Sequence, residues 1–301
     1  MINTKTINTS ELSISGVPIN NVICIGSTST LTVQENASSN SVDATWNYNS
    51  NIVHIEKVFM YHTYMAKLVP ISVGITNVTA TYNGKQISFN LEVDKNEIYI
   101  SPANHKKPYI KPDGKTWYTT SQWNEKKNME IVANHLKSYL DNYWVHVFLT
   151  NHTTDQGEYY GRPEEARDWM FDSNNALYLA LHSNAGAGGS TNTRGSTGYY
   201  NHNGDIQPLA LSLVNAVDAI LPGGTNRATP TIAGNYSSGT PTYAGNLGEL
   251  RVPEEYNIAS VLIENGFHDN PSQAAFLISN QQLLAETIGT VLVNYFNIPH
   301  R

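Results

Sequence analysis

The sequence predicts two domains of different class: an all-β sandwich over residues 1–94 and an α/β three-layer domain with a mostly parallel central sheet over residues 95–301. Three observations lead to this prediction. The 301 residues suffice for two domains, since a typical domain has about 150 residues. Short alternating or β-branched runs fill the first third, where no helical period competes. Beyond residue 95, strand-like runs alternate with segments of helical period.

The first domain is expected to consist of short strands separated by Gly, Asn and Ser. The Asn83-Gly84 dipeptide is a strong hairpin signal, because a type I′ turn needs positive φ at both central residues. Residues 24–33 (CIGSTSTLTV), 44–51 (ATWNYNSN) and 74–93 resemble the bacterial immunoglobulin-like domains of surface and cell-wall proteins. That resemblance implies a wall-targeting or spacer module, by analogy.

Composition excludes several classes of function. The net charge of −7 is spread over both halves and leaves no basic stripe, so nucleic acid is not an expected partner. The single cysteine, Cys24, excludes an intrachain disulfide and a thiolate metal cluster, and its apolar neighbours predict a buried core residue. The N-terminus has no apolar signal-peptide core, and no apolar run is long enough to span a membrane. We therefore expect a soluble chain without a secretory address of its own.

The second domain is expected to alternate strands with helices. Residues 125–139 place Met129, Val132, Leu136 and Leu140 on one helical face. Pro163 suits the first position of a helix, and Pro222-Gly223-Gly224 ends another. Residues 225–248 have neither period and predict a surface loop or irregular hairpin. The predicted strands are 97–101, 143–150, 177–182 and 260–264, and the predicted helices are 125–139, 163–172, 207–221, 271–278 and 281–296.

Polar residues gather where the predicted strands end. Ligands bind at the carboxyl ends of the strands in such sheets, and His105, Glu125, His182 and Glu264 come from four segments that reach this edge. Two histidines and one glutamate around an open position are a ligand set typical of catalytic zinc, and a second glutamate can act as general base. Taken singly, each of the four could equally be an ordinary polar residue at a loop edge. Their convergence favours a metal site.

Seven short markers occur in a fixed order along this half of the chain: SPANH (101–105), NEKKNMEIVANHL (124–136), GRPEEA (161–166), LALHSNAG (179–186), GYY (198–200), ELR (249–251) and VLIENGFHDN (261–270). Over residues 98–296 the chain thereby resembles the zinc-dependent N-acetylmuramoyl-L-alanine amidases of bacterial cell-wall turnover and phage endolysins. The resemblance implies one zinc ion bound by His105, Glu125 and His182, with Glu264 as the catalytic carboxylate. The implied reaction is hydrolysis of the amide between N-acetylmuramic acid and the L-alanine of the stem peptide in peptidoglycan.

The first marker departs from the family pattern. The family usually has D-P-G-H-G-G, whereas SPANH places its histidine one residue later and lacks the glycines. A branch of the family with an S-P-S/A opening is similar, so His105 remains the expected third ligand, with water or Asn104 as alternatives. His152, His202 and His268 lie near the same edge and are expected to face solvent or to support a ligand.

Three further residues are assigned to substrate binding. Arg251 could hold a stem-peptide carboxylate through its planar guanidinium, or simply be solvated at a loop end. Tyr199 is expected to line the groove with its flat ring, although it and Tyr200 could also pack in the core. Asn184 follows His182 at the strand end and precedes the small residues of AGAGGS, which would let a glycan strand approach. Arg162 is expected to be structural.

Three functions are compatible with this pattern: a peptidoglycan amidase, a zinc hydrolase of other wall specificity such as a peptidase or deacetylase, and a non-catalytic wall-binding or tail component. The amidase is the expected function, and the non-catalytic component is the least favoured because all four family positions are filled. Its expected place of action is the bacterial cell wall, on the extracellular side. Because the sequence shows no signal peptide, we expect the protein to be encoded by a phage, or to reach the cell wall through lysis or injection.

Overall fold

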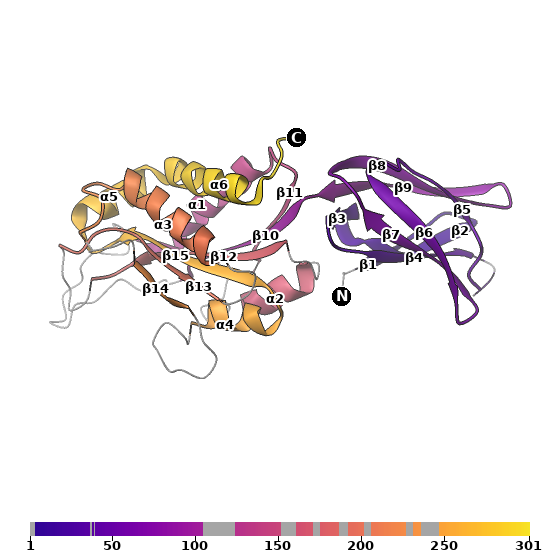
Figure 1. The fold of residues 1–301 in the computed structure, drawn as a ribbon, viewed down its shortest axis with the longest axis horizontal. Helices are drawn as coiled ribbons and strands as arrows, with labels where there is room; N and C mark the ends of the chain where they lie inside the picture. The colour runs from indigo at the N-terminus through magenta and orange to yellow at the C-terminus, as the bar shows by residue number, and fades with distance from the viewer. Residues whose placement is uncertain are drawn as a thin grey trace. The chain divides into compact units, whose positions relative to one another are not determined.

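The structure is a computed structural model that describes residues 4–36, 38, 40–104, 124–151, 161–170, 175–186, 192–201, 206–226 and 247–301, together with the backbone of 231–235. The chain divides into two compact units (Figure 1). The first comprises Met1–Glu97, Trp144–His146 and Asp168–Ala176, and the second comprises Ile98–Tyr143, Val147–Arg167 and Leu177–Arg301.

Strands dominate the first unit. They are β1 (Thr4–Asn8), β2 (Leu12–Pro18), β3 (Val22–Cys24), β4 (Ser29–Glu35), β5 (Thr45–Asn47), β6 (Val53–Met60), β7 (Thr63–Pro70), β8 (Gly74–Tyr82) and β9 (Lys85–Asp94), with a short 3₁₀ turn at Ile19–Asn21. One sheet has the order β1-β2-β4-β7-β6 and the other β3-β9-β8-β5. Alternate residues from both sheets share one hydrophobic core, which includes Leu12, Leu31, Leu68, Val78 and Leu91. Cys24 is fully buried, as predicted.

The hairpin predicted at Asn83-Gly84 is confirmed. Tyr82 and Lys85 are the last pair of the antiparallel strands β8 and β9, so the turn has two residues. Asn83 has φ 48° and Gly84 has φ 77°, both left-handed, as the type I′ turn requires.

The second unit is built around a mixed sheet of six strands. The strands are β10 (Asn96–Pro102), β11 (Val145–Leu149), β12 (Ala176–Asn184), β13 (Thr197–Tyr200), β14 (Thr231–Asn235) and β15 (Ala259–Phe267), in the order β11-β10-β12-β15-β13-β14. The central strands β12 and β15 are parallel, as are β13 and β14. β13 runs antiparallel to β15, which the sequence did not predict.

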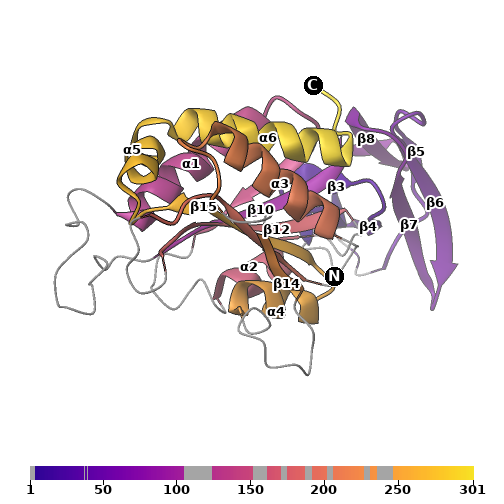
Figure 2. The same ribbon diagram turned by 60° about the vertical axis from the view of Figure 1, so that its left-hand side comes forward.

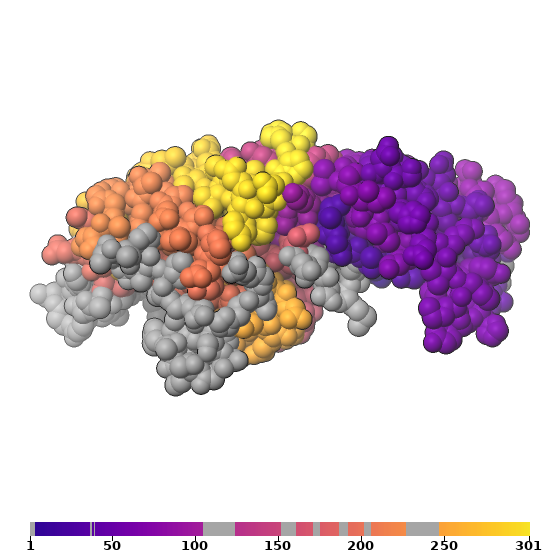
Figure 3. All heavy atoms as spheres, in the orientation of Figure 1, coloured from indigo at the N-terminus to yellow at the C-terminus, as the bar shows by residue number. Residues whose placement is uncertain are grey.

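Helices cover both faces of this sheet, in agreement with the predicted three-layer architecture (Figures 1 and 2). On one face lie α1 (Glu125–Leu140), α3 (Gln207–Ile220), α5 (Pro271–Ser279) and α6 (Gln281–Phe296), and on the other lie α2 (Arg162–Trp169) and α4 (Gly248–Glu255). The side chains of α3 and α6 lie against each other on the outer surface (Figure 3). None of the helices in the described part of the chain has both the length and the apolar character needed to cross a membrane.

Most predicted elements form close to their expected bounds. The apolar face of α1 is buried as expected, with Met129, Val132, Leu136 and Leu140 inaccessible to solvent. In the described part of the second unit, three elements were not predicted: β13, β14 and α4. β14 lies inside the segment expected to be a surface loop or irregular hairpin, and it pairs with β13. β13 has only four residues, and α4 contains Pro253, so neither has a clear periodic signal.

The left-handed conformation assigned to the Asn83-Gly84 turn can be tested by substitution. A Cβ added at Gly84 meets no atom within 4 Å, so Gly84→Ala is opposed only by the left-handed backbone. We expect the free energy of unfolding of this unit to fall by about 1–2 kcal/mol. Asn83→Gly is the control and should be tolerated, because glycine adopts positive φ freely. Calorimetric unfolding measures both, and an unchanged transition for Gly84→Ala would contradict the assigned turn.

Candidate active site

The site is organised by the pairing of β12 with β15. His182 and Glu264 are direct partners across these parallel strands. Laterally paired residues of a sheet project to the same face, so the imidazole and the carboxylate emerge side by side. Leu177–Leu181 and Val261–Ile263, which precede them, are buried on both faces and hold the two strands at the centre of the sheet.

A bulge in β15 ends this regular pairing. His182 pairs with Glu264, but Asn184 pairs with Phe267, so β15 carries one extra residue between the two pairs. Gly266 has φ 121°, a conformation that strongly favours glycine, and a Cβ there would crowd Leu221 at 3.2 Å. Asn265 donates from Nδ2 to the carbonyl oxygen of His182 at 3.1 Å. The bulge therefore fixes the local backbone around both site residues.

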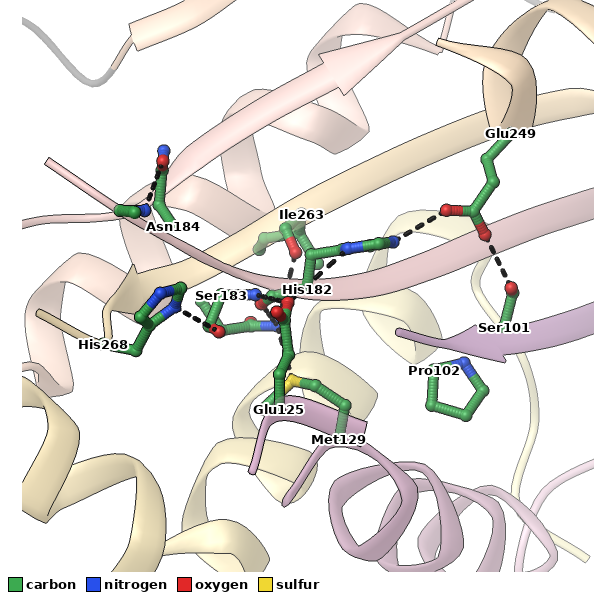
Figure 4. Close-up of polar contacts among 12 residues, drawn as sticks. Ser101, Pro102, Glu125, Met129, His182, Ser183, Asn184, Glu249, Ile263 and His268 are labelled. Atoms are coloured by element: carbon green, nitrogen blue, oxygen red, sulfur yellow. Dashed lines mark hydrogen bonds and ion pairs between the residues drawn. The ribbon is translucent and has the colours of Figure 1, made fainter. Parts of the chain in front are cut away.

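Glu125 reaches the same place from the start of α1. Asn124 caps this helix by accepting a hydrogen bond from the backbone N–H of Lys127, so Glu125 is the first helical residue, where negative charge is favoured. Glu125 Oε1 accepts a hydrogen bond from the backbone N–H of Ser183 at 2.8 Å. The same oxygen lies 3.6 Å from His182 Nδ1. Figure 4 shows Glu125 beneath the end of β12, close to His182 and Ser183.

Glu249 is a site residue that the sequence analysis missed. It lies in the first turn of α4 and is 2% exposed. Its Oε2 is 2.7 Å from His182 Nε2, on the opposite side of the imidazole from Glu125 (Figure 4). The hydroxyls of Ser101 and Tyr178 donate to its Oε1 at 2.6 and 3.0 Å. The ELR marker contains this residue, but the sequence predicts a functional role only for Arg251 of that marker.

Arg162 binds this cluster through Ser101. It is 1% exposed and donates from Nη1 to Ser101 Oγ at 3.2 Å and to the carbonyl oxygen of Pro102. Burial alone would raise the pKa of Glu249, but the charge and hydrogen bond of His182, the Ser101 hydroxyl and the charge of Arg162 lower it overall. Glu249 is therefore held as a carboxylate.

The charges of the carboxylates also act on His182 and Glu264. Burial would lower the pKa of His182, but the charge of Glu249 and hydrogen bonds to Glu125 and Glu249 raise it well above its usual value. Burial raises the pKa of Glu264 to about 7, opposed by the charge of His182 and reinforced by Glu125 and Glu249. Glu264 Oε2 is buried and has no hydrogen-bond partner within the described part of the chain.

These donors fit part of a zinc site. Two ligands of a tetrahedral zinc ion, each about 2.0–2.2 Å from the metal, lie about 3.3–3.6 Å apart. The separation of His182 Nδ1 and Glu125 Oε1, 3.6 Å, is close to that value. No group of three or more His, Cys, Asp or Glu residues able to hold a metal occurs among the described residues. The predicted third ligand, His105, lies outside them.

Asn104, the alternative third ligand, and the nearby His268 have other partners. Asn104 is buried, and its Oδ1 accepts a hydrogen bond from Lys126 Nζ at 2.7 Å. His268 does not face solvent: it is 6% exposed, and its Nδ1 lies 2.9 Å from Ser183 Oγ. It thereby contacts the residue whose backbone N–H binds Glu125. His152 and His202 lie outside the described residues.

The predicted substrate-binding residues lie on separate elements. Asn184 ends β12, and its Oδ1 accepts from the backbone N–H of Ala185 at 2.8 Å; Figure 4 shows it directed away from His182. Tyr199 is half-buried on β13, opposite Leu262. Arg251 forms an ion pair with Glu255 at 2.6 Å on the partly exposed side of α4. The structure therefore does not bring these three together with His182 as it does Glu125.

Solved structures provide one comparison. The chain is similar to N-acetylmuramoyl-L-alanine amidase AmiC2 of Nostoc punctiforme, with 20% identity, TM-score 0.46 and coverage of 67% of this chain and 97% of that chain. It is also similar to an N-acetylmuramoyl-L-alanine amidase from Clostridium difficile 630, with 19% identity, TM-score 0.48 and coverage of 67% and 97%. For the catalytic domain of CwlV from Bacillus (Paenibacillus) polymyxa var. colistinus the values are 19%, 0.45, 67% and 99%.

No curated protein matches the chain. A family model described as N-acetylmuramoyl-L-alanine amidase matches residues 109–294, more than half of the chain, and this range includes Glu125, His182 and Glu264. The chain therefore belongs to the N-acetylmuramoyl-L-alanine amidase family, whose substrate is peptidoglycan.

Proposed function

We propose that this protein is a zinc-dependent N-acetylmuramoyl-L-alanine amidase. Its substrate is peptidoglycan, and the bond it cleaves joins the lactyl group of N-acetylmuramic acid to the L-alanine of the stem peptide. The observation that carries the proposal is that His182 Nδ1 lies 3.6 Å from Glu125 Oε1, while His182 is also the direct strand partner of Glu264. We assign one zinc ion to Glu125, His182 and His105.

The chain's own residues account for the proton transfers of this reaction. A zinc ion at this site supplies Lewis-acid polarisation of the scissile carbonyl and a lower pKa for the attacking water. Glu264 takes the proton of that water and delivers it to the leaving nitrogen of L-alanine. Its carboxyl, whose Oε2 is buried and whose pKa is about 7 in the metal-free protein, suits both roles at neutral pH.

Substrate contacts are assigned to Asn184, Tyr199 and Arg251. Asn184 lies two residues after His182, and its side-chain amide can bind the peptide or sugar. The half-buried ring of Tyr199 provides a flat platform for a sugar. Arg251 pairs with Glu255 in this structure. Its guanidinium can instead donate hydrogen bonds to a carboxylate of the stem peptide.

The first unit is proposed to be an immunoglobulin-like wall-targeting or spacer module, preceding a catalytic domain that begins near residue 95. Two sheets around one core and the confirmed type I′ hairpin support a sandwich of this class. The proposed place of action is the cell wall, on the extracellular side. We also propose that the protein acts as a phage endolysin or as a lysin delivered by injection.

The function is tested with purified cell walls. Wild-type protein should lower wall turbidity and release N-terminal L-alanine, and removal of zinc with a chelator should stop the reaction. Glu264→Ala should keep its zinc but lose about 10²–10⁴-fold in activity, the usual effect of removing a general acid–base group. Glu286→Gln is the matched control and should keep wild-type activity, because Glu286 is half-buried on α6, where it accepts a hydrogen bond from Gln282.

The products separate the proposal from its competitors. A new N-terminal D-amino acid would indicate a peptidase, and released acetate would indicate a deacetylase. Wall binding without hydrolysis, by a protein with less than one zinc per chain, would indicate a non-catalytic component. Full activity in Glu264→Ala would refute the assigned mechanism.

Glu264 also predicts a pH dependence of stability in the metal-free protein. Its pKa is about 7 in the folded state and near 4.5 when unfolded. Between these values the folded state holds a proton that the unfolded state has lost, so the free energy of unfolding falls as pH rises. This decrease in the free energy of unfolding levels off above the folded pKa of about 7 and amounts to about 3 kcal/mol. Glu264→Gln removes this pH dependence, because the amide does not titrate.

The measurement is urea unfolding in the presence of a chelator at pH 4.5, 6 and 8. We expect the stability of Glu264→Gln relative to wild type to increase across this range. Glu286→Gln should follow the wild-type profile. Parallel profiles for wild type and Glu264→Gln would show that the Glu264 carboxyl titrates as an ordinary exposed group.

A further inference from the structure

Glu249 is buried against a histidine that belongs to the proposed metal site, yet its own carboxylate is turned away from Glu125. It contacts His182 at Nε2, whereas Glu125 lies near Nδ1 (Figure 4). We propose that Glu249 is the positioning residue of His182: it binds the Nε2–H, so that Nδ1 keeps its lone pair and faces the metal. This inference rests on the function proposed above.

The argument begins with the chemistry of imidazole. A neutral imidazole has one N–H donor and one nitrogen with a lone pair, and its neighbours decide which is which. An ionised carboxylate only accepts hydrogen bonds. Glu249 Oε2, 2.7 Å from Nε2, therefore requires the hydrogen of the neutral ring on Nε2. The lone pair is left on Nδ1, 3.6 Å from Glu125 Oε1, where the two atoms fit one zinc ion.

Hydrogen bonds on its other side prevent Glu249 from turning. Its Oε1 accepts from Ser101 Oγ at 2.6 Å and from Tyr178 OH at 3.0 Å. A hydroxyl has one hydrogen to donate, and that of Ser101 goes to Glu249, while its lone pair accepts from Arg162 Nη1 at 3.2 Å. The result is a directed chain from Arg162 through Ser101 and Glu249 to His182, which joins α2, β10, α4 and β12.

The placement of Tyr178 adds to this support. It lies four residues before His182 on β12, so both side chains project to the same face of the sheet. Tyr178 is fully buried, and its ring stacks on that of Tyr99 at 5.2 Å between centroids. A rigid ring thus fixes the hydroxyl that binds Glu249. The positioning carboxylate is held by two hydroxyls and the imidazole, so it has no oxygen turned toward Glu125.

The competing explanation is that Glu249 only anchors α4 to the sheet. Both explanations predict a loss of stability when Glu249 is changed, so stability cannot separate them. Zinc affinity can, because only a positioning role alters the nitrogen that binds the metal. Carboxylates that orient a metal-bound histidine typically contribute about 10–100-fold to metal affinity.

The experiment measures the zinc dissociation constant of the full chain by competition with a chromophoric chelator, with circular dichroism of the metal-free proteins as a check of folding. Glu249→Gln should bind zinc about 10–100-fold more weakly than wild type. Glu255→Gln is the control, since it makes the same change on the exposed side of the same helix and should leave the affinity unchanged. If Glu249→Gln does not fold, the double variant Ser101→Ala/Tyr178→Phe removes the donors that hold Glu249 and should weaken zinc binding in the same direction.

The outcomes are distinct. A zinc affinity within about twofold of wild type in folded Glu249→Gln, or in the double variant, overturns the positioning role while leaving the proposed amidase intact. Wild-type protein that binds no zinc overturns the proposed function, and this inference with it. Weakened binding in Glu249→Gln with an unchanged Glu255→Gln supports the positioning role.

Discussion

The lateral pairing of His182 with Glu264 is the constraint on which the rest of the site depends. Parallel strands at the centre of a covered sheet are buried on both faces, so polar side chains can emerge only where the strands end. This pair lies close to the ends of β12 and β15, at Asn184 and Phe267, and the bulge at Gly266 interrupts the register directly beyond it. A one-residue slip of either strand would turn its site residue to the opposite face. The apolar runs before both residues oppose that slip, so the packing of the core and the placement of the site have the same origin.

Burying charged groups here requires that they compensate one another. Isolated buried charges are strongly unfavourable, and a buried ion pair is tolerated only when its remaining lone pairs and protons are bound. Glu249 meets that condition with three donors, and Arg162 places a fixed positive charge behind Ser101. Glu264 does not, since its Oε2 has no partner among the described residues. The unsatisfied oxygen belongs to the residue to which we assign proton transfer, whereas the satisfied carboxylate belongs to the residue to which we assign positioning.

The sequence was informative where a local pattern determines structure. The 3.6-residue period of α1 and the short apolar runs of β12 and β15 predicted those elements. The rule that strand ends gather at one edge predicted that His182 and Glu125 lie close together. Glu249 could not be found in that way, because it reaches His182 across 67 residues of sequence through the packing of α4. Its helix has eight residues and an internal proline, and it follows a polar stretch without a period. The ELR marker was a signal, but a lone triplet does not indicate which of its residues turns inward.

The balance of charge explains why this arrangement suits a bound cation. Glu125, Glu249 and Glu264 bring three carboxylates to one histidine, and within the hydrogen-bonded cluster Arg162 is the buried permanent cation. In the metal-free protein the carboxylates raise the pKa of His182 against the effect of burial, whereas burial is the main cause of the raised pKa of Glu264, reinforced by the charges of Glu125 and Glu249. A divalent cation between Nδ1 and Glu125 would compensate the charge of the carboxylates and release the protons that these raised pKa values retain. Nε2, which is bound to Glu249, then keeps its hydrogen in both the metal-free and the metal-bound protein. Glu249 therefore holds the imidazole in the same orientation in both states.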